Sequence, residues 1–329
     1  MSQKEIDFIP HTPAVLKQIF ERRGIAPNKR FGQNFLIDQN ILVSIPDIAT
    51  LKEDDVIMEI GTGTGGLTRL LASRSRHVFT IEVDKKLFEL SSDILKLYKN
   101  ITLINADILK TKHELNPDIL SLIHNWIREH SQAQIKVVSN LPYNISTPVI
   151  INLLEGDLPI SFMVLMLQKE ITERMKAIPG TREYGILSVI TQLFSEVEVV
   201  KTLSPDVFWP RPAVHSALVK VVIHKEKYAG RVTDYPFFGK IIYAIFTSRR
   251  KTLMNSLEKL NLPIVSREHL KVIMKEMQLD ERIRGESLSV AQLIHLSEAI
   301  GKLKNPPDEI SNRIKLGKIS DVFDQHFIE

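Results

Sequence analysis

The tetrapeptide Asn140-Leu141-Pro142-Tyr143 combines groups that can hold a planar amine. The Asn140 side-chain oxygen and the Leu141 backbone carbonyl are two acceptors, Pro142 fixes the backbone φ, and Tyr143 adds an aromatic face. This set suits the N6 amine of adenine, whose lone pair is delocalised into the ring. Acceptors on its two hydrogens make that pair available to an electrophilic methyl group. Because N6 becomes strongly acidic as the bond forms, no carboxylic base is required and positioning is the main task.

Phe208, which precedes a turn containing Pro210 and Pro212, is the candidate for the other face of the base. Stacking contributes about 1–3 kcal/mol per base, enough to offset much of the cost of unstacking a nucleotide. Taken alone, Tyr143 or Phe208 is more simply an ordinary core aromatic, so the neighbouring motifs carry this interpretation. Trp209 is expected to pack in the core.

A glycine cluster, Gly61-Thr62-Gly63-Thr64-Gly65-Gly66, follows the apolar run Val56–Ile60 and precedes residues with helical spacing. Strand, tight turn and helix in this order allow the backbone to approach a cofactor closely. The glycines also satisfy the dinucleotide fingerprint, and Glu82 lies where an acid that binds a ribose diol is expected. The cluster alone therefore leaves NAD, S-adenosylmethionine and a purely structural turn open.

Residues further along the chain favour S-adenosylmethionine. Asn105-Ala106-Asp107 follows the third predicted strand, where the carboxylate can accept a hydrogen bond from a cofactor adenine, and Asn140 follows the fourth. The carboxyl ends of strands in an open α/β sheet converge on one crevice, so these residues are predicted to line one pocket with Gly61, Gly63 and Glu82. An NAD-dependent oxidoreductase would leave Asn140–Tyr143 without a task.

Strands and helices alternate along the part of the chain that must position these residues. The predicted strands are Val56–Ile60, His77–Val83, Ile101–Ile104, Ile135–Ser139 and Ser161–Leu167. Segments long enough for crossover helices separate them, which predicts a doubly wound, Rossmann-like sheet. Glu198–Leu203 and Ala217–Ile223 are predicted to pair antiparallel at its end. Helical spacing from Pro236 onward predicts a small all-helical C-terminal domain.

Composition excludes several classes of protein. Apolar residues make up 43% and charged residues 25%, which argues against disorder, and the absence of cysteine excludes disulfides and thiolate sites. No apolar run has the length that a bilayer demands, and the N-terminus does not resemble a signal peptide. We therefore expect a cytoplasmic monomer with no metal and no membrane association.

Positive charge is concentrated in two places, although the net charge is only +4. Between Lys201 and Leu260, eleven Lys and Arg stand against four Asp and Glu, an excess of seven that includes Arg249-Arg250-Lys251. A second basic cluster comprises Lys17, Arg22, Arg23, Lys29 and Arg30. Solvated helix faces and phosphate contacts explain each cluster equally well.

Together these motifs make the chain similar to the ribosomal RNA adenine N6-dimethyltransferases, from about Pro13 to Ser289, and most of all to those that act on 16S rRNA. The matching segments are Phe31–Asp38, Glu59–Gly63, Glu82, Asn105–Asp107, Asn140–Ser146, Phe208–Ser216 and Arg249–Leu253. The core motifs do not separate 16S enzymes from relatives that modify 23S rRNA. Leu141, Pro148 and the Arg249–Leu253 segment favour the 16S group.

The resemblance implies S-adenosylmethionine as cofactor and a role for each site residue. Asn34 and Leu36 would contact its methionine end, Gly61 the loop side, Glu82 the ribose and Asp107 the adenine amine, with Asn140 between cofactor and target. Tyr143 and Phe208 would sandwich the target adenine. The implied product is two adjacent N6,N6-dimethyladenosines in a hairpin near the 3′ end of 16S rRNA, in the 30S subunit or its precursor.

The same resemblance implies that different segments of the chain form domains with different roles. We expect residues 1–38 to form an N-terminal basic segment with the first cofactor motif, and 39–228 the Rossmann-like methyltransferase domain. Residues 235–303 would form a helical RNA-binding domain, with Arg249, Arg250 and Lys251 as contacts, and 304–329 a tail. A ribosome-assembly factor whose methylation is secondary is the second alternative, and the two roles can coexist.

Overall fold

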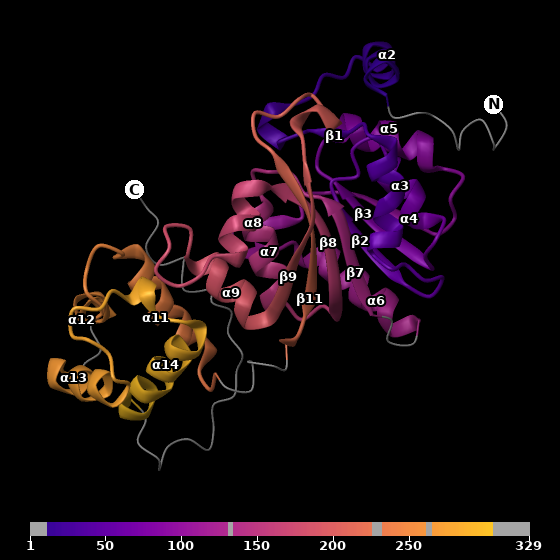
Figure 1. Cartoon of the computed structure of the whole chain (residues 1–329). Coiled ribbons are helices and arrows are strands. Elements are labelled where there is room, and N and C mark those ends of the chain that lie inside the picture. Colours follow the sequence, from indigo (N-terminus) through magenta and orange to yellow (C-terminus); the bar gives the residue numbers. More distant parts are fainter. Residues whose placement is uncertain (1–11, 131–133, 226–231, 261–264, 305–329) are drawn as a thin grey trace. The chain divides into compact units, whose positions relative to one another are not determined.

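A computed structural model of the chain describes residues 12–130, 134–225, 232–260 and 265–304. Its contacts divide the chain into two compact units (Figure 1). The first comprises residues 1–153, 157–172 and 197–223, and the second comprises 154–156, 173–196 and 224–329. Residues 173–196 thus pack with the second unit, although the predicted domain boundary placed them in the first. The predicted tail after residue 304 lies outside the described residues.

A seven-stranded sheet forms the centre of the first unit. In spatial order its strands are β4 (Ile101–Asn105), β3 (His77–Glu82), β2 (Val56–Ile60), β7 (Ile135–Asn140), β8 (Ile160–Gln168), β11 (Ser216–Ile223) and β9 (Ser195–Leu203). The strands from β4 to β8 pair in parallel, and β11 pairs antiparallel with β8. The predicted Rossmann-like fold is confirmed, and β9 and β11 are neighbours at the end of the sheet as predicted.

Helices cover both faces of this sheet because each parallel strand needs a crossover to reach the next. The helices of the first unit are α2 (Pro13–Arg23), α3 (Gln39–Ile48), α4 (Gly66–Ala72), α5 (Lys85–Leu95), α6 (Pro117–Glu129) and α7 (Ser146–Glu155), whose last two residues belong to the second unit. Ile45 of α3 and Leu71 of α4 share a core with Ile57 of β2. On the other face, Trp126 of α6 contacts Phe79 of β3 edge to face.

Strand order reverses between β2 and β7, and this is the point where open α/β sheets bind ligands. From β2 the chain moves outward through β3 to β4, and it then returns to the other side of β2 as β7. The carboxyl ends of β2, β3 and β7 therefore surround one crevice. The residues predicted to carry chemistry follow these strands.

Six short elements in the described part of the first unit were not predicted. Strands β1 (Phe35–Leu36) and β10 (Phe208–Trp209) form an antiparallel ribbon, and β5 (Leu109–Thr111) pairs with β6 (Glu114–Leu115). The short helix η1 (Lys29–Phe31) precedes β1, and η2 (Pro205–Val207) precedes β10. Strands of two or three residues are too short to give a periodic pattern, which explains why the sequence did not reveal them.

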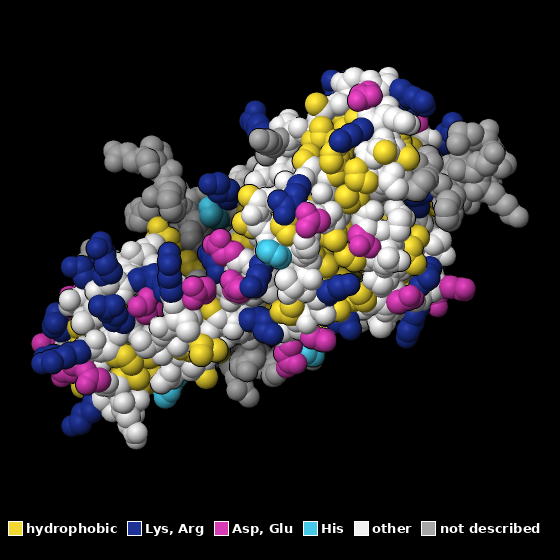
Figure 2. Space-filling model, turned by 45° about the horizontal axis from the view of Figure 1, so that its top comes forward, with side chains coloured by type: hydrophobic (Ala, Val, Ile, Leu, Met, Phe, Trp, Pro, Cys, Tyr) yellow, Lys and Arg dark blue, Asp and Glu magenta, His cyan; other side chains and the backbone are white. Residues whose placement is uncertain are grey.

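The described parts of the second unit are mainly helical. Its helices are the end of α8 (Lys169–Lys176), α9 (Ile186–Phe194), α11 (Tyr235–Thr247), α12 (Leu253–Leu257), η3 (Glu258–Leu260), α13 (Arg267–Glu276), η4 (Gly285–Ser287) and α14 (Val290–Lys304). Phe238 and Ile241 of α11 are fully buried, as the helical spacing predicted. Figure 2 shows Lys and Arg side chains gathered on one face of this unit, with Asp and Glu among them.

Candidate active site

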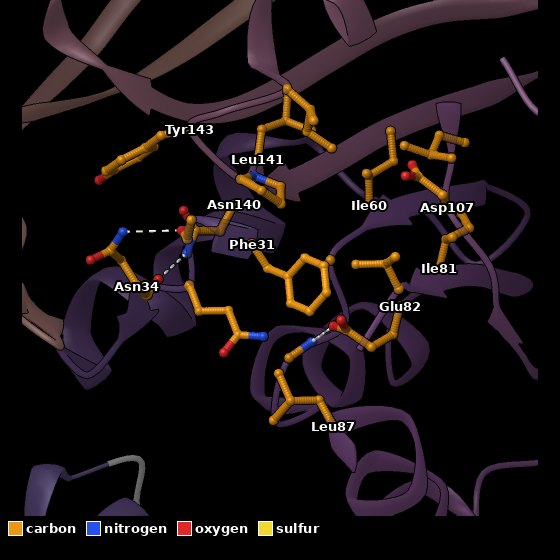
Figure 3. Close-up of a pocket in the computed structure, with 18 of the residues that line it drawn as sticks. Phe31, Asn34, Ile60, Ile81, Glu82, Leu87, Asp107, Asn140, Leu141 and Tyr143 are labelled. Atoms are coloured by element: carbon orange, nitrogen blue, oxygen red, sulfur yellow. Dashed lines mark hydrogen bonds between the residues drawn. The ribbon is translucent and has the colours of Figure 1, made fainter. Parts of the chain in front are cut away.

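A pocket of about 650 Å³, part of it open to solvent, lies at the carboxyl ends of β2, β3 and β7 (Figure 3). Nine of the predicted site residues line it: Asn34, Gly61, Gly63, Glu82, Asp107, Asn140, Leu141, Pro142 and Tyr143. These residues come from segments spread over more than a hundred positions of the chain. The sheet brings them together as the sequence predicted.

The glycine turn after β2 fits a close approach of ligand and backbone. Gly61, Gly63 and Gly65 have φ values of +89°, +57° and +74°, which favour glycine. A Cβ added to Gly63 would lie 3.2 Å from the Phe35 ring, and one added to Gly61 would lie 3.4 Å from Pro142. The turn is therefore packed between the β1 segment and the tetrapeptide, and its positive φ values strain any residue other than glycine.

Glu82, at the end of β3, is a buried carboxylate held by backbone amides. Its Oε2 accepts a hydrogen bond from the Gly63 N–H at 2.8 Å, and its Oε1 accepts one from the Asp84 N–H at 2.9 Å. Burial raises the pKa of Glu82, against the lowering effect of these hydrogen bonds. Each carboxylate oxygen can accept a second hydrogen bond, so the group can still bind a pair of hydroxyls.

Asp107 lies at the other side of the pocket, directly after β4 and Ala106. Its Oδ1 accepts a hydrogen bond from the Leu109 N–H at 2.9 Å, and its backbone carbonyl accepts one from Asn116 Nδ2 at 3.1 Å. The side chain is exposed along one edge of the pocket. An ordered, exposed carboxylate at this position can accept a hydrogen bond from an amino group of a ligand.

The side chain of Asn140 has a defined orientation. Its Nδ2 donates to the backbone carbonyl of Asn34 at 2.8 Å, and Asn34 Nδ2 donates to the carbonyl of Gly32 at 3.1 Å. Reversing the Asn140 amide would set its oxygen against the Asn34 carbonyl, so the hydrogen bond fixes which atom is which. The Oδ1 acceptor of Asn140 is thereby available to the pocket.

The rest of the tetrapeptide is held by its own turn and by β11. The Pro142 carbonyl accepts hydrogen bonds from Ile145 N–H at 3.2 Å and Ser146 Oγ at 2.9 Å. The Tyr143 hydroxyl lies 2.6 Å from Ser216 Oγ, and burial raises the pKa of this phenol. Its ring is thus fixed at both ends while it lines the pocket.

Two predicted site residues do not line the pocket. Leu36 and Phe208 lie opposite each other in the β1–β10 ribbon, and both belong to the hydrophobic core. The Phe208 ring is only 2% exposed, so in this conformation it does not offer a face to a base. The pocket instead contains Phe31, which lies in the Phe31–Asp38 motif but which the sequence did not single out as a site residue.

The three predicted RNA-binding residues of the second unit, Arg249, Arg250 and Lys251, differ in their contacts. The Arg249 guanidinium donates to Glu286 Oε2 at 2.5 Å and to the carbonyls of Arg182 and Thr181 at 2.7 and 3.1 Å. Arg250 and Lys251 are exposed instead. Arg249 is therefore engaged in contacts within the unit, whereas its two neighbours are exposed to a partner.

The described residues form neither a cluster that could hold a metal ion nor a helix that could span a membrane. Within residues 12–130, 134–225, 232–260 and 265–304, no group of three or more His, Asp or Glu side chains is placed to hold a metal ion. Nor does any helix in those ranges combine the length and apolarity needed to cross a bilayer.

Comparisons with known proteins agree with this site. The family model described as ribosomal RNA adenine dimethylase matches residues 25–301. A protein of Halothermothrix orenii named ribosomal RNA small subunit methyltransferase A is 40% identical over 297 residues, covering 90% of this chain and 95% of its own length. A protein of a Geobacillus species with the same name is 40% identical over 293 residues, covering 88% and 97%.

Solved structures support the fold. A dimethyladenosine transferase from Plasmodium falciparum aligns with a TM-score of 0.64 at 24% identity, covering 81% of this chain and 97% of its own. The 23S rRNA methyltransferase ErmE aligns with a TM-score of 0.56 at 23% identity, covering 82% and 100%. At such identities the likeness concerns the architecture alone.

Proposed function

The chain belongs to the ribosomal RNA adenine dimethylase family, and from this premise we propose that it dimethylates N6 of adenosines in small-subunit ribosomal RNA with S-adenosylmethionine as methyl donor. The observation that carries the proposal is the Asn140 amide, which the Asn34 carbonyl turns so that its oxygen can accept a hydrogen bond from an amine. Relatives at 40% identity over about nine tenths of the chain bear a small-subunit name, which supports the choice of subunit.

The residues of the pocket fit this cofactor. Glu82 can accept hydrogen bonds from both ribose hydroxyls, and Asp107 can accept one from the adenine amine. The turn at Gly61 and Gly63 has the positive φ values that favour glycine, and without side chains there the ligand can lie against backbone. Asn34 and the segment around it close the methionine side. When bound, the cofactor supplies an electrophilic methyl group on a sulfonium.

The tetrapeptide would position the target amine. Asn140 Oδ1 and the Leu141 carbonyl accept hydrogen bonds from the two N6 hydrogens, which directs the nitrogen lone pair toward the methyl group. The Tyr143 ring, fixed through Ser216, lies against one face of the base. For Phe208 to cover the second face, its ring must leave the core beside Leu36. No carboxylic base takes part, because N6 becomes strongly acidic as the N–CH3 bond forms and its proton passes to solvent, to which the pocket is open.

The finer parts of the proposal concern the substrate and its setting. We infer two adjacent adenosines in a hairpin near the 3′ end of 16S rRNA, in the 30S subunit or its precursor, and a role in ribosome biogenesis. The protein would act as a monomer in the cytoplasm, and residues 235–303 would hold RNA through Arg250 and Lys251, which are exposed and basic. Arg249 would support them from within the unit.

Methyl transfer to unmethylated ribosomal particles tests the proposal. Purified protein is incubated with tritiated S-adenosylmethionine and with 30S or 50S subunits, and mass mapping identifies the modified nucleotide. The expected product is N6,N6-dimethyladenosine in 16S rRNA alone, formed about 10²–10³ times more slowly with Asn140→Ala. Label in 23S rRNA would overturn the choice of subunit. Binding of NADH, with none of S-adenosylhomocysteine in calorimetry, would overturn the choice of cofactor.

A further inference from the structure

We propose that Gln33 is a positioning residue for the cofactor, because its side-chain amide ties one wall of the pocket to Asp84, whose backbone N–H holds Glu82. This wall is formed by residues 31–35. The inference rests on the proposed function, in which Glu82 binds the ribose of S-adenosylmethionine. It adds a residue that acts on the cofactor through its neighbours.

The wall comes from a part of the chain outside the seven-stranded sheet. Residues 31–35 all line the pocket, and the two-residue strand β1 that begins at Phe35 pairs with β10 in a separate ribbon. Glu82, by contrast, ends β3 within the large sheet. The distance between the wall and Glu82 is therefore not set by sheet hydrogen bonds, and side-chain contacts set it.

Both ends of the Gln33 amide are hydrogen-bonded. Its Oε1 accepts from the Asn28 N–H at 2.7 Å, and its Nε2 donates to Asp84 Oδ2 at 3.0 Å. A reversed amide would set its oxygen against the Asp84 carboxylate and its NH2 group against the Asn28 N–H, so the two partners fix its orientation. The side chain thus links the N-terminal segment to a residue 51 positions further along the chain.

Asp84 is itself held by its neighbours in the chain. Its Oδ1 caps α5 by accepting hydrogen bonds from the N–H groups of Lys86 and Leu87 at 2.9 and 3.4 Å. Its own N–H donates to Glu82 Oε1 at 2.9 Å. Because one carboxylate oxygen caps the helix, the other is the acceptor for Gln33. Asp84 therefore connects the position of Glu82 with that of the wall.

The side of the wall that lies against the tetrapeptide is held by other contacts. Asn34 Nδ2 donates to the Gly32 carbonyl at 3.1 Å, and the Asn34 carbonyl accepts from Asn140 Nδ2 at 2.8 Å. Neither contact involves the Gln33 side chain. Loss of the Gln33–Asp84 hydrogen bond should therefore weaken cofactor binding but leave methyl transfer from the bound cofactor nearly unchanged.

A reciprocal exchange of the two partners tests the proposal. Gln33→Glu sets one carboxylate against another, and Asp84→Asn, which can still cap α5, sets one NH2 group against another. Each single variant should raise the Kd for S-adenosylhomocysteine about 10-fold or more, because a charge-assisted hydrogen bond is lost. In the double variant the new amide can donate to the new carboxylate, so the Kd should return to within about threefold of the wild-type value.

The same variants separate cofactor binding from chemistry. In methyl transfer to 30S subunits, each single variant should raise the KM for S-adenosylmethionine and keep kcat within about twofold of the wild-type value. Calorimetry with S-adenosylhomocysteine gives the Kd values. Gln18→Glu and Asp118→Asn make the same changes at exposed positions of α2 and α6, and as controls they should change neither Kd nor KM.

Three results would overturn the role of Gln33. They are single variants that bind S-adenosylhomocysteine as the controls do, a double variant that binds no better than the weaker single variant, and a fall in kcat as large as the rise in KM. Wild-type protein that binds S-adenosylhomocysteine but methylates no ribosomal RNA would instead overturn the proposed function, while the Kd values would still decide the role of Gln33.

Discussion

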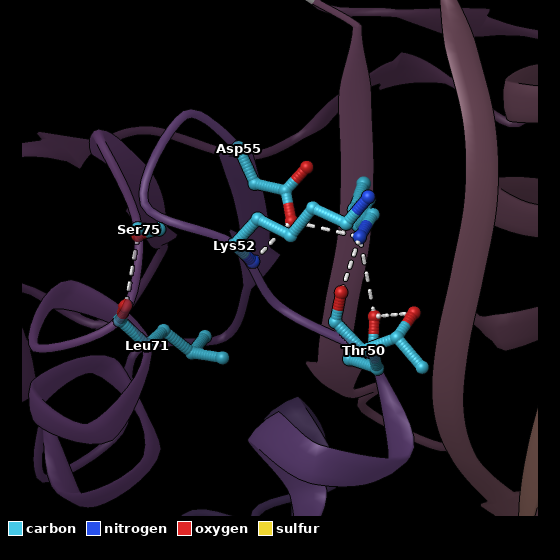
Figure 4. Close-up of polar contacts among 7 residues, drawn as sticks. Thr50, Lys52, Asp55, Leu71 and Ser75 are labelled. Atoms are coloured by element: carbon cyan, nitrogen blue, oxygen red, sulfur yellow. Dashed lines mark hydrogen bonds and ion pairs between the residues drawn. The ribbon is translucent and has the colours of Figure 1, made fainter.

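The polar side chains at the amino ends and at the carboxyl ends of the parallel strands, called here the amino and carboxyl edges of the sheet, differ in how fully the protein satisfies their hydrogen bonds. At the amino edge, Lys136 of β7 donates to Asp55 Oδ2 at 2.7 Å and to the carbonyls of Thr50 and Ala49 at 2.8 and 3.3 Å (Figure 4). Asp55 accepts a further hydrogen bond from the Lys52 N–H. All three ammonium protons are thus used within the protein, and the side chains of Lys136 and Asp55 are only 14% and 18% exposed.

At the carboxyl edge, the protein satisfies only part of the hydrogen-bonding capacity of the pocket residues Glu82 and Asn140. Glu82 and Asn140 are oriented by backbone groups, yet each keeps acceptor capacity toward the pocket. A polar group that the protein saturates contributes stability, whereas one that is oriented and half satisfied can bind a ligand. Substitutions at the two edges should therefore separate stability from activity.

The largest effect is expected for Lys136→Met, which should lower the free energy of unfolding by about 3–5 kcal/mol. The reason is that Asp55 would remain as a mostly buried charge without its partner. Urea unfolding measures the loss, and the folded fraction should keep its methyl-transfer rate. Lys52→Met, at an exposed neighbour, is the control. A lower methyl-transfer rate of the folded fraction would contradict this contrast between the two edges.

Asn140→Ala should have the opposite effect and lower the methyl-transfer rate without lowering the stability. Loss of one oriented acceptor in a preorganised site costs about 10²–10³ in kcat, while stability and the Kd for RNA should change little. Single-turnover methyl transfer and RNA binding are measured in parallel. Asn125→Ala, on an exposed position of α6, should leave both unchanged. Equal losses of rate and RNA affinity with Asn140→Ala would refute the proposed role.

Glu82→Gln should weaken S-adenosylhomocysteine binding about 10–100-fold, because one charge-assisted hydrogen bond is lost. Burial raises the pKa of Glu82, so in the wild type binding should fail on acidification earlier than for an ordinary carboxyl group. Calorimetry over a pH series checks both points. The exposed Glu89→Gln on α5 is the control, and an unchanged acid limb in Glu82→Gln would contradict the assignment.

Glu59, in β2, also lies toward the carboxyl edge, but it is buried within the protein and does not line the pocket. It is 1% exposed, its Oε2 accepts hydrogen bonds from Thr68 and Thr80 at 2.6 Å each, and burial raises its pKa from 4.5 to about 8. The folded state therefore keeps a proton that the unfolded state loses. The resulting stability is present below about pH 4.5 and is lost as pH rises toward 8, at up to about 1.4 kcal/mol per pH unit.

Glu59→Gln should remove this pH dependence, because the amide stays neutral while keeping the shape of the protonated acid. Urea unfolding of both proteins between about pH 5 and pH 8 measures it. Thr68 and Thr80 remain as hydrogen-bond partners, so the variant should fold. Parallel curves for the wild type and the variant would show that Glu59 does not carry the proton.

The smallest effect concerns the second unit, where the same contrast holds between neighbouring residues. Arg249 donates hydrogen bonds to Glu286 and to two carbonyls, whereas Arg250 and Lys251 are exposed. Arg250→Ala or Lys251→Ala should each reduce the salt slope of RNA binding by about one, with stability unchanged. Arg249→Ala should instead lower the melting temperature. A salt-slope change confined to Arg249→Ala would reverse this division.

The sequence by itself determined the architecture and most of the pocket. The strands from Val56–Ile60 to Ser161–Leu167 lie within two residues of the observed ones, because buried parallel strands are continuous apolar runs bounded by turn residues. The glycine turn, Glu82, Asp107 and Asn140–Tyr143 come together because each lies at or just after the carboxyl end of a strand. For these residues, position along the chain was sufficient to predict that they line the pocket.

Only the tertiary structure decided how these groups are oriented and which of them are free. Asn140 owes its orientation to the carbonyl of Asn34, Phe208 is buried opposite Leu36, and Arg249 is occupied by Glu286. Each of these contacts joins segments remote in the chain, and a local pattern of residue types carries no record of such a partner. Residue type and spacing therefore fixed which groups reach the site, while long-range packing fixed which lone pairs and charges remain available to a ligand.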